Sequence, residues 1–265
     1  MRRTNLYLDR GSVLERLHPQ VKLGILAATF ASAYAMEEPF VLLPVAGTLG
    51  VLIAVAGALP NVRRLAPMFA AVPVATFVIW SLFYGRGEPL RALAFLGRRA
   101  PSAEALEYAA AMAVKLESFL AASVLFLSIT RVEEFTDSLR GLGMPYRMSF
   151  AVAMAFRLVP LFLSSALSVV IAQRARGLDF SRGNVFARLG RYVPVIVPVF
   201  MGALRRADAM AMALETRGFS RAGERTTFTR SRFGATDAVA AAMILSVVAV
   251  YLWIWVHGYG KPWLR

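Results

Sequence analysis

The chain contains no cysteine, and its 265 residues include only two histidines, His18 and His257. Without cysteine there can be no disulfide framework and no thiolate metal site. The two histidines are far apart and fit no metal-binding spacing such as HExxH, and the sequence has no GxxxxGK[ST] phosphate loop. An intramembrane enzyme would need a convergent set of nucleophilic, acidic and imidazole groups, which this sequence lacks. We therefore expect a protein that is not an enzyme and that holds no cofactor, metal ion or Walker-type ATP site.

Acidic residues are also scarce, with 16 Asp and Glu against 30 Lys and Arg and a formal net charge of +14. Hydrophobic residues make up 58% of the chain and the mean hydropathy is +0.57, which is high for a soluble domain. An excess of cations can indicate nucleic-acid binding, but in so apolar a chain it favours anionic lipid or an acidic protein partner. The polar N-terminal segment is too long for a cleavable signal peptide. The sequence thus predicts an integral membrane protein that binds no nucleic acid.

Five apolar runs predict transmembrane helices, because about 20 apolar residues cross a bilayer as a helix. They cover approximately residues 21–36, 40–59, 66–84, 106–129 and 235–256. Pro67 and Pro73 predict a bend in the third run. The fourth run contains Lys115 and Glu117, which either mark a transport path, or extend to the interface or pair with opposite charges on neighbouring helices.

The distribution of arginine orients these helices. Four arginines precede the first run, the loop "MEEP" after it has no cation, and Arg63 and Arg64 follow the second run. The positive-inside rule therefore predicts a cytoplasmic N-terminus. The loop of residues 84–104 disagrees, since it carries four arginines although alternation places it outside.

Residues 131–234 carry sixteen Arg and seven Asp or Glu, a net charge of +9. The segment opens with an amphipathic helix, and hydropathy alone would make residues 149–172 a further transmembrane helix. The next apolar run, 192–204, is too short to span and is followed at once by Arg205 and Arg206. We therefore expect 131–234 to be a cytoplasmic coupling module of long amphipathic helices, one of them about 42 Å long over residues 149–176. It would separate a transmembrane domain of residues 1–130 from a last helix and tail at 235–265.

Two similar motifs end the two long helices of this module. The first reads "RGLDFSR" from Arg176 and the second "RGFSR" from Arg217, 41 residues later. Gly177 and Gly218 fit the position after a helix end where positive φ is required, so each motif can be an ordinary helix cap. Arginine also suits a bidentate clamp on a carboxylate across an interface. Two equivalent cationic helix ends would then indicate an acidic partner that is present as a pair.

The chain resembles the transmembrane T component of energy-coupling factor transporters, the EcfT/CbiQ family. The resemblance covers nearly the whole chain: "RLHPQVKLGIL" is similar to the family's N-terminal opening, and "AQRARGLDF" and "AMALETRGF" are similar to its two Ala-Arg-Gly motifs. The first motif matches in full at Ala175, Arg176 and Gly177. The second has Thr216 in the place of alanine before Arg217 and Gly218.

The resemblance implies a multi-pass protein of a prokaryotic cell membrane that works with partners. Two cytoplasmic ATP-binding-cassette ATPases would dock on the Arg motifs, and a membrane S component would bind a vitamin or a cobalt or nickel ion. The ATPase activity would belong to the partner subunits. The alternative is a self-contained secondary transporter or channel, which predicts more polar or broken positions near the midplane than these spans contain.

Overall fold

The computed structural model describes residues 7, 10–84, 102–180, 190–219, 221 and 233–257. Within these residues the regular structure is helical and contains no strand. The chain divides into two compact units, the first made of Met1–Met144 with Ser231–Arg265 and the second of Pro145–Arg230. The second unit is therefore an insertion between two parts of the first.

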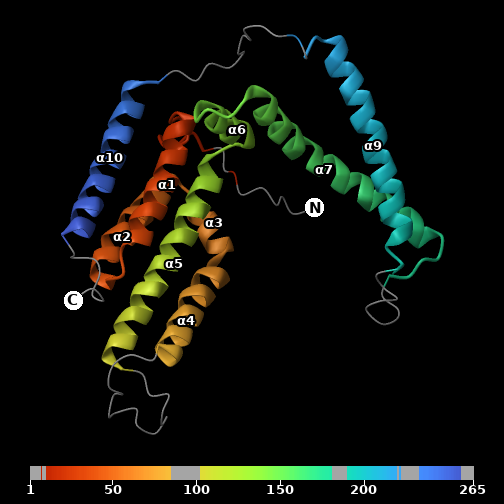
Figure 1. Ribbon diagram of the computed structural model, residues 1–265. Helices are drawn as coiled ribbons and strands as arrows, with labels where there is room; N and C mark the ends of the chain where they lie inside the picture. Colours follow the sequence, from red (N-terminus) through yellow and green to blue (C-terminus); the bar gives the residue numbers. More distant parts are fainter. Residues whose placement is uncertain are drawn as a thin grey trace. The chain divides into compact units, whose positions relative to one another are not determined.

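The described residues of the first unit form the helices labelled α1 to α6 and α10 in Figure 1. They are α1 (Pro19–Ala35), α2 (Pro39–Val55), α3 (Leu59–Arg64), α4 (Ala66–Phe83), α5 (Ala103–Ile129), α6 (Val132–Gly141) and α10 (Ala235–Val256). Prolines in the first turn of α1, α2, α3 and α4 start these helices without loss of a hydrogen bond, because the first-turn N–H groups have no partner within the helix. Ser102 begins α5 by accepting a hydrogen bond from the N–H of Ala105 at 3.0 Å.

Helix α5 is the centre of the first unit, with α1, α2, α3 and α4 packed against it. Its buried face consists largely of alanine and serine, including Ala109, Ala121, Ala122 and Ser118. Small residues let helix backbones approach closely, which is how helices gain packing contacts inside a bilayer. By contrast, α4 and α10 are almost entirely exposed, as expected of helices that face lipid.

Helices form at all five apolar runs that the sequence predicts to span the membrane. By length and composition α4, α5 and α10 are candidate spans, whereas α1 and α2 have 17 residues each and α2 ranks only as a shorter apolar helix. Tyr146–Ala175 is the fourth candidate. The number of spans therefore remains a prediction. Pro67 lies in the first turn of α4, so only Pro73 lies inside that helix.

The second unit is built on two long helices, α7 (Tyr146–Ala175) and α9 (Val193–Thr216). They run antiparallel, because Phe150 near the start of α7 packs on Phe219 after the end of α9, with ring centroids 4.6 Å apart. At the other end, Gln173 donates a hydrogen bond to the carbonyl of Pro194 at 3.3 Å. The 30 residues of α7 give a length of about 45 Å, and it begins three residues earlier than the predicted Ser149. Ser149 and Val195 are the only side chains that α7 and α9 bury.

Candidate coupling site on the second unit

Both Arg-Gly motifs form the same helix C-cap. After α7, the N–H of Gly177 donates to the carbonyl of Arg174 at 2.9 Å, and the N–H of Leu178 donates to that of Gln173 at 3.0 Å. After α9, Gly218 donates to Glu215 and Phe219 to Leu214, each at 2.9 Å. This pair of bonds is the Schellman motif, which needs a left-handed residue after the cap.

The glycines supply that left-handed conformation, with φ of +88° at Gly177 and +72° at Gly218. The predicted glycine conformation is confirmed, and it fixes where the two arginines stand. Arg176 and Arg217 are the C-cap residues themselves, at the negative end of each helix dipole. The local hydrogen bonds thus place one guanidinium group at the end of each long helix.

The two arginine side chains are exposed, as are Ala175 and Thr216 before them. In the described part of the chain, no hydrogen bond or ion pair engages either guanidinium group. Thr216 bonds within its own helix, its hydroxyl donating to the carbonyl of Ala213 at 3.0 Å. Since α7 and α9 are antiparallel, the arginines lie at opposite ends of the pair, about one helix length or 36 Å apart for the 24 residues of α9.

The aromatic residue that both motifs share has a structural role. Phe180 after the first motif is buried and packs on Tyr192, with ring centroids 5.1 Å apart, while the guanidinium of Arg174 lies 5.9 Å from its centroid. Phe219 after the second motif packs on Tyr146 and Phe150. Each aromatic therefore fastens the chain beyond a cap to the neighbouring helix, and the arginine is left to face outward.

Comparison with known proteins identifies the family. The family model CbiQ, described as cobalt transport protein, matches residues 10–228. The chain belongs to the CbiQ family. The match includes both Arg-Gly motifs and most of the first unit.

Relatives of this CbiQ family member carry the name energy-coupling factor transporter transmembrane protein EcfT. The protein from Bacillus selenitireducens is 27% identical over 261 residues, which cover 93% of this chain and 94% of the relative. The protein from Thermosediminibacter oceani is also 27% identical over 261 residues, covering 93% of this chain and 97% of the relative. That from Limosilactobacillus fermentum is 33% identical over 121 residues, 45% of each chain.

The two charged residues of α5 belong to the first unit. Lys115 is buried, and its ammonium group donates to the carbonyl of Tyr34 at 3.3 Å, near the end of α1. This bond joins α5 to α1 through a backbone carbonyl group, not through the opposite charge that the sequence analysis considered. Glu117 is half-buried, and its Oε2 atom has no hydrogen-bond partner among the described residues. The described residues contain no group of three or more His, Cys, Asp or Glu able to hold a metal ion.

The sequence analysis missed a polar cluster at the start of α1 in this CbiQ protein. Lys22 is almost fully buried, with 1% of its surface exposed. Its ammonium group nevertheless forms an ion pair with the carboxylate of Glu134 at 2.7 Å. The run 21–36 was interpreted simply as an apolar span, although its second residue is this lysine. A single cation at the start of a membrane helix is a usable signal, since buried charge needs a partner.

Proposed function

We propose that this chain is the T component of an energy-coupling factor importer. It would pass the motion of two cytoplasmic ATPases to a membrane S component that binds a vitamin or a cobalt or nickel ion. Membership of the CbiQ family and the EcfT names of its relatives support the role. The observation that carries the proposal is the pair of exposed arginines, held by identical caps at opposite ends of α7 and α9.

An exposed arginine at a helix end suits a planar carboxylate, which it can bind through two parallel hydrogen bonds. Two such ends about 36 Å apart fit one site on each of two similar subunits better than two sites on one small domain. The antiparallel pair is also a suitable connector, because movement of either subunit displaces one end of a shared body. ATP binding and hydrolysis would take place in the partners.

A cytoplasmic position for the second unit is supported by the ends of the first unit. Lys22 near the start of α1 bonds the carbonyl of Ile129 at the end of α5 at 2.9 Å, and the N–H of His18 bonds Asp237 in the first turn of α10 at 2.6 Å. The end of α5 and the start of α10 thus lie at the same end of the unit. The chain between them must cross the membrane an even number of times.

Helix α7 alone could span by length and composition, but an even number would require α9 to cross as well. The apolar part of α9 covers residues 193–204 and is about 18 Å long, against roughly 30 Å of hydrocarbon. Arg205, Arg206 and Asp208 follow it directly. Zero crossings therefore fits these residues best, with both long helices on the cytoplasmic side.

The test is purification of the tagged chain from its own organism in mild detergent. We expect two ATPase subunits and a small membrane protein to co-purify, and the complex to take up its substrate only with ATP. A chain that transports alone in vesicles, driven by an ion gradient without ATPases, would instead establish the self-contained secondary transporter.

A further inference from the structure

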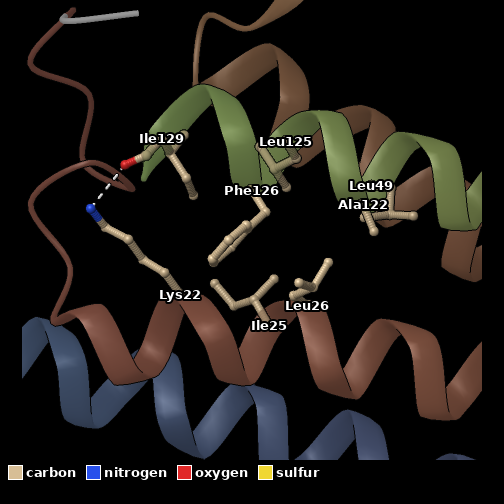
Figure 2. Close-up of a pocket in the computed structure, with 8 residues that line it drawn as sticks. All are labelled: Lys22, Ile25, Leu26, Leu49, Ala122, Leu125, Phe126 and Ile129. Atoms are coloured by element: carbon tan, nitrogen blue, oxygen red, sulfur yellow. Dashed lines mark hydrogen bonds between the residues drawn. The ribbon is translucent and has the colours of Figure 1, made fainter. Parts of the chain in front are cut away.

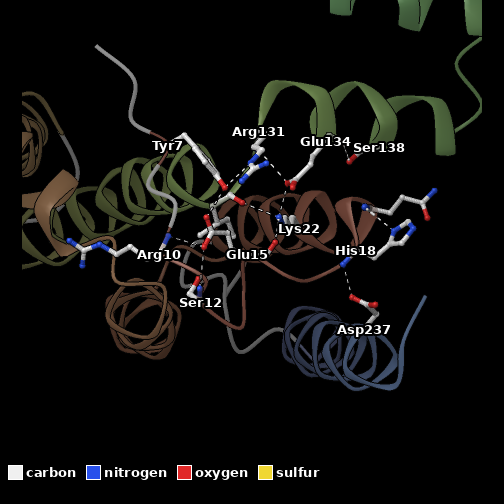
Figure 3. A network of polar contacts seen from close by, with 12 residues as sticks. Tyr7, Arg10, Ser12, Glu15, His18, Lys22, Arg131, Glu134, Ser138 and Asp237 are labelled. Carbon is white, nitrogen blue, oxygen red and sulfur yellow. Dashed lines mark hydrogen bonds and ion pairs between the residues drawn. The ribbon is translucent and has the colours of Figure 1, made fainter. Parts of the chain in front are cut away.

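The start of α1 bonds both the helix that precedes the second unit in the chain and the helix that follows it. The chain leaves the first unit after α6 and returns to it at α10, since the second unit covers Pro145–Arg230. Both α6 and the start of α10 are fastened to residues 15–22, which we call the anchor segment (Figure 3).

Helix α6, which precedes the second unit in the chain, is bonded by Lys22. Its ammonium group donates to Glu134 Oε2 of α6 at 2.7 Å, to the carbonyl of Glu15 at 2.7 Å and to the carbonyl of Ile129 at 2.9 Å. These three bonds use all three donors of the ammonium group, and they join the anchor segment, the end of α5 and the start of α6. A buried charge satisfied in this way holds its partners in one geometry.

The apolar side chains beside Lys22 offer its ammonium group no hydrogen-bond partner. A small cavity beside its side-chain stem is lined otherwise by apolar side chains of α1, α2 and α5, and the ammonium group turns away from it toward Ile129 (Figure 2). An apolar cavity offers no alternative partner to the charge. The bonds of the ammonium group are therefore made on the side away from the cavity, to Glu134 and the two carbonyl groups.

The end of α6 lies close to α1. A Cβ atom built at Gly141 would overlap the end of the Gln20 side chain, so a larger residue there would require that flexible side chain to move. Helix α6 is thus bonded to the anchor segment near its start, through Glu134, and lies close to it near its end, at Gly141.

The start of α10 is held by Asp237. Its carboxylate is buried and accepts the N–H of His18 at 2.6 Å through Oδ1 and the N–H of Gly234 at 2.8 Å through Oδ2. The ring of His18 also packs on Phe233, with centroids 5.3 Å apart. The start of α10 is therefore bound to the residue that precedes α1.

From these contacts we infer that the anchor segment transmits displacement of the second unit to the membrane helices, with Lys22 and Asp237 as its positioning residues. If α6 and the start of α10 contacted nothing else in the first unit, their displacement would not reach the other helices. Because both are bonded to the anchor segment, a displacement of either is carried to α1, and through the carbonyl of Ile129 to α5. This role rests on the proposed function, because it concerns how ATP-driven motion reaches the membrane.

The test is a complex that carries Lys22→Met and Asp237→Asn together. Methionine keeps an apolar stem beside the cavity but removes the charge, and asparagine presents an amide donor where Asp237 accepts two N–H groups. We expect the ATPases to remain bound and ATP hydrolysis to stay within about twofold of wild type. Uptake of radiolabelled Co²⁺, Ni²⁺ or biotin, whichever the wild-type complex transports, should fall at least tenfold.

The matched control is Arg63→Met, which removes an exposed cation of α3 from the same unit and should change neither rate. Uptake within twofold of wild type in the double variant overturns the inference. So does a parallel loss of hydrolysis and uptake, which would make these residues purely structural. If no ATPase co-purifies with the wild-type chain, the proposed function itself is refuted, and this is established before any variant is measured.

A disulfide rescue keeps the test decisive if the double variant does not accumulate. The chain has no native cysteine, so a single disulfide can be introduced with Gln20→Cys and Gly141→Cys. The first substitution removes the amide that a Cβ atom at position 141 would overlap, and the two thiols can then form a disulfide between α1 and α6. Combined with Glu134→Gln, oxidation should restore uptake and reduction should abolish it. If the uptake rate is the same in the oxidised and the reduced protein, the proposed role of the anchor segment is wrong.

Discussion

The sharpest prediction concerns Arg176 and Arg217, whose guanidinium groups stand exposed at the C-caps of α7 and α9. Replacing either arginine with alanine would leave an acidic group of the partner unpaired. Losing one member of a buried charge pair at an interface costs about 2–5 kcal/mol, or roughly thirty-fold in affinity at the lower limit. We expect each single variant to impair uptake by about that factor.

The double variant should lose much more, because the two ends belong to one antiparallel pair. A single variant keeps one intact contact, which holds the weakened second contact close to its partner at high effective concentration, whereas the double variant keeps no intact contact. Arg176→Ala with Arg217→Ala should therefore release the ATPases and abolish uptake. Lysine at either position should restore uptake only in part, because an ammonium group cannot provide two parallel hydrogen bonds to a carboxylate.

The assay is purification of the complex from cells that carry each variant, followed by uptake into vesicles. Arg205→Ala is the matched control, since it removes an exposed arginine from the body of α9 rather than from its cap. Membrane insertion should be equal in all variants. If the double-alanine chain retains both ATPases and full transport, the arginines are helix caps without a partner.

Three further predictions follow from the contacts. A cysteine at Met212 should be shielded from an impermeant thiol reagent in intact cells while one at His257 is labelled, and the opposite pattern would refute the topology. Phe219→Ala should lower the melting temperature of the second unit by removing its contacts with Tyr146 and Phe150, at a cost of about 3–5 kcal/mol at most for a large aromatic side chain, and an unchanged temperature would contradict that packing. Burial raises the pKa of Glu15, but hydrogen bonds from Tyr7 and from backbone N–H groups outweigh it and hold the pKa below the usual 4.5. Its contribution to stability is therefore present above about pH 4.5 and is lost as the pH falls through the lowered pKa, so Glu15→Gln should flatten the acid side of a melting-temperature profile, and parallel profiles would refute this.

The local features of the second unit could be predicted from the sequence. The positive φ of Gly177 and Gly218 follows from a glycine that ends an alanine-rich helical run, because a C-cap is decided by neighbouring residues. The same reasoning predicts that the long helix ends at Arg176, one residue beyond the observed end of α7 at Ala175. The start of α7 was set three residues late, since Pro145 already has the extended backbone that precedes a helix and Tyr146 begins it.

The polar contacts of the anchor segment could not be predicted in this way. Lys22 bonds groups 107 and 112 residues further along the chain, and His18 bonds one 219 residues away. No periodicity relates positions so far apart, and a hydropathy average over a membrane helix conceals a single lysine. Only the packing of α1 beside α5, α6 and α10 reveals why a charge lies at the start of an apolar helix.

The residues that precede and follow the second unit both contact the start of α1, since α6 bonds Lys22 and the start of α10 bonds His18. We expect an inserted unit whose flanking helices are held within the other unit to be replaceable by a homologous one. A chimera that takes residues 145–230 from a relative should fold on the present membrane unit, because His18, Lys22 and Asp237 all lie outside the exchanged piece. If the proposed function is correct, such a chimera should bind the ATPases of the relative and keep the membrane partner of the present chain. The ATPase partner and the transported substrate would then be determined by different units of the chain.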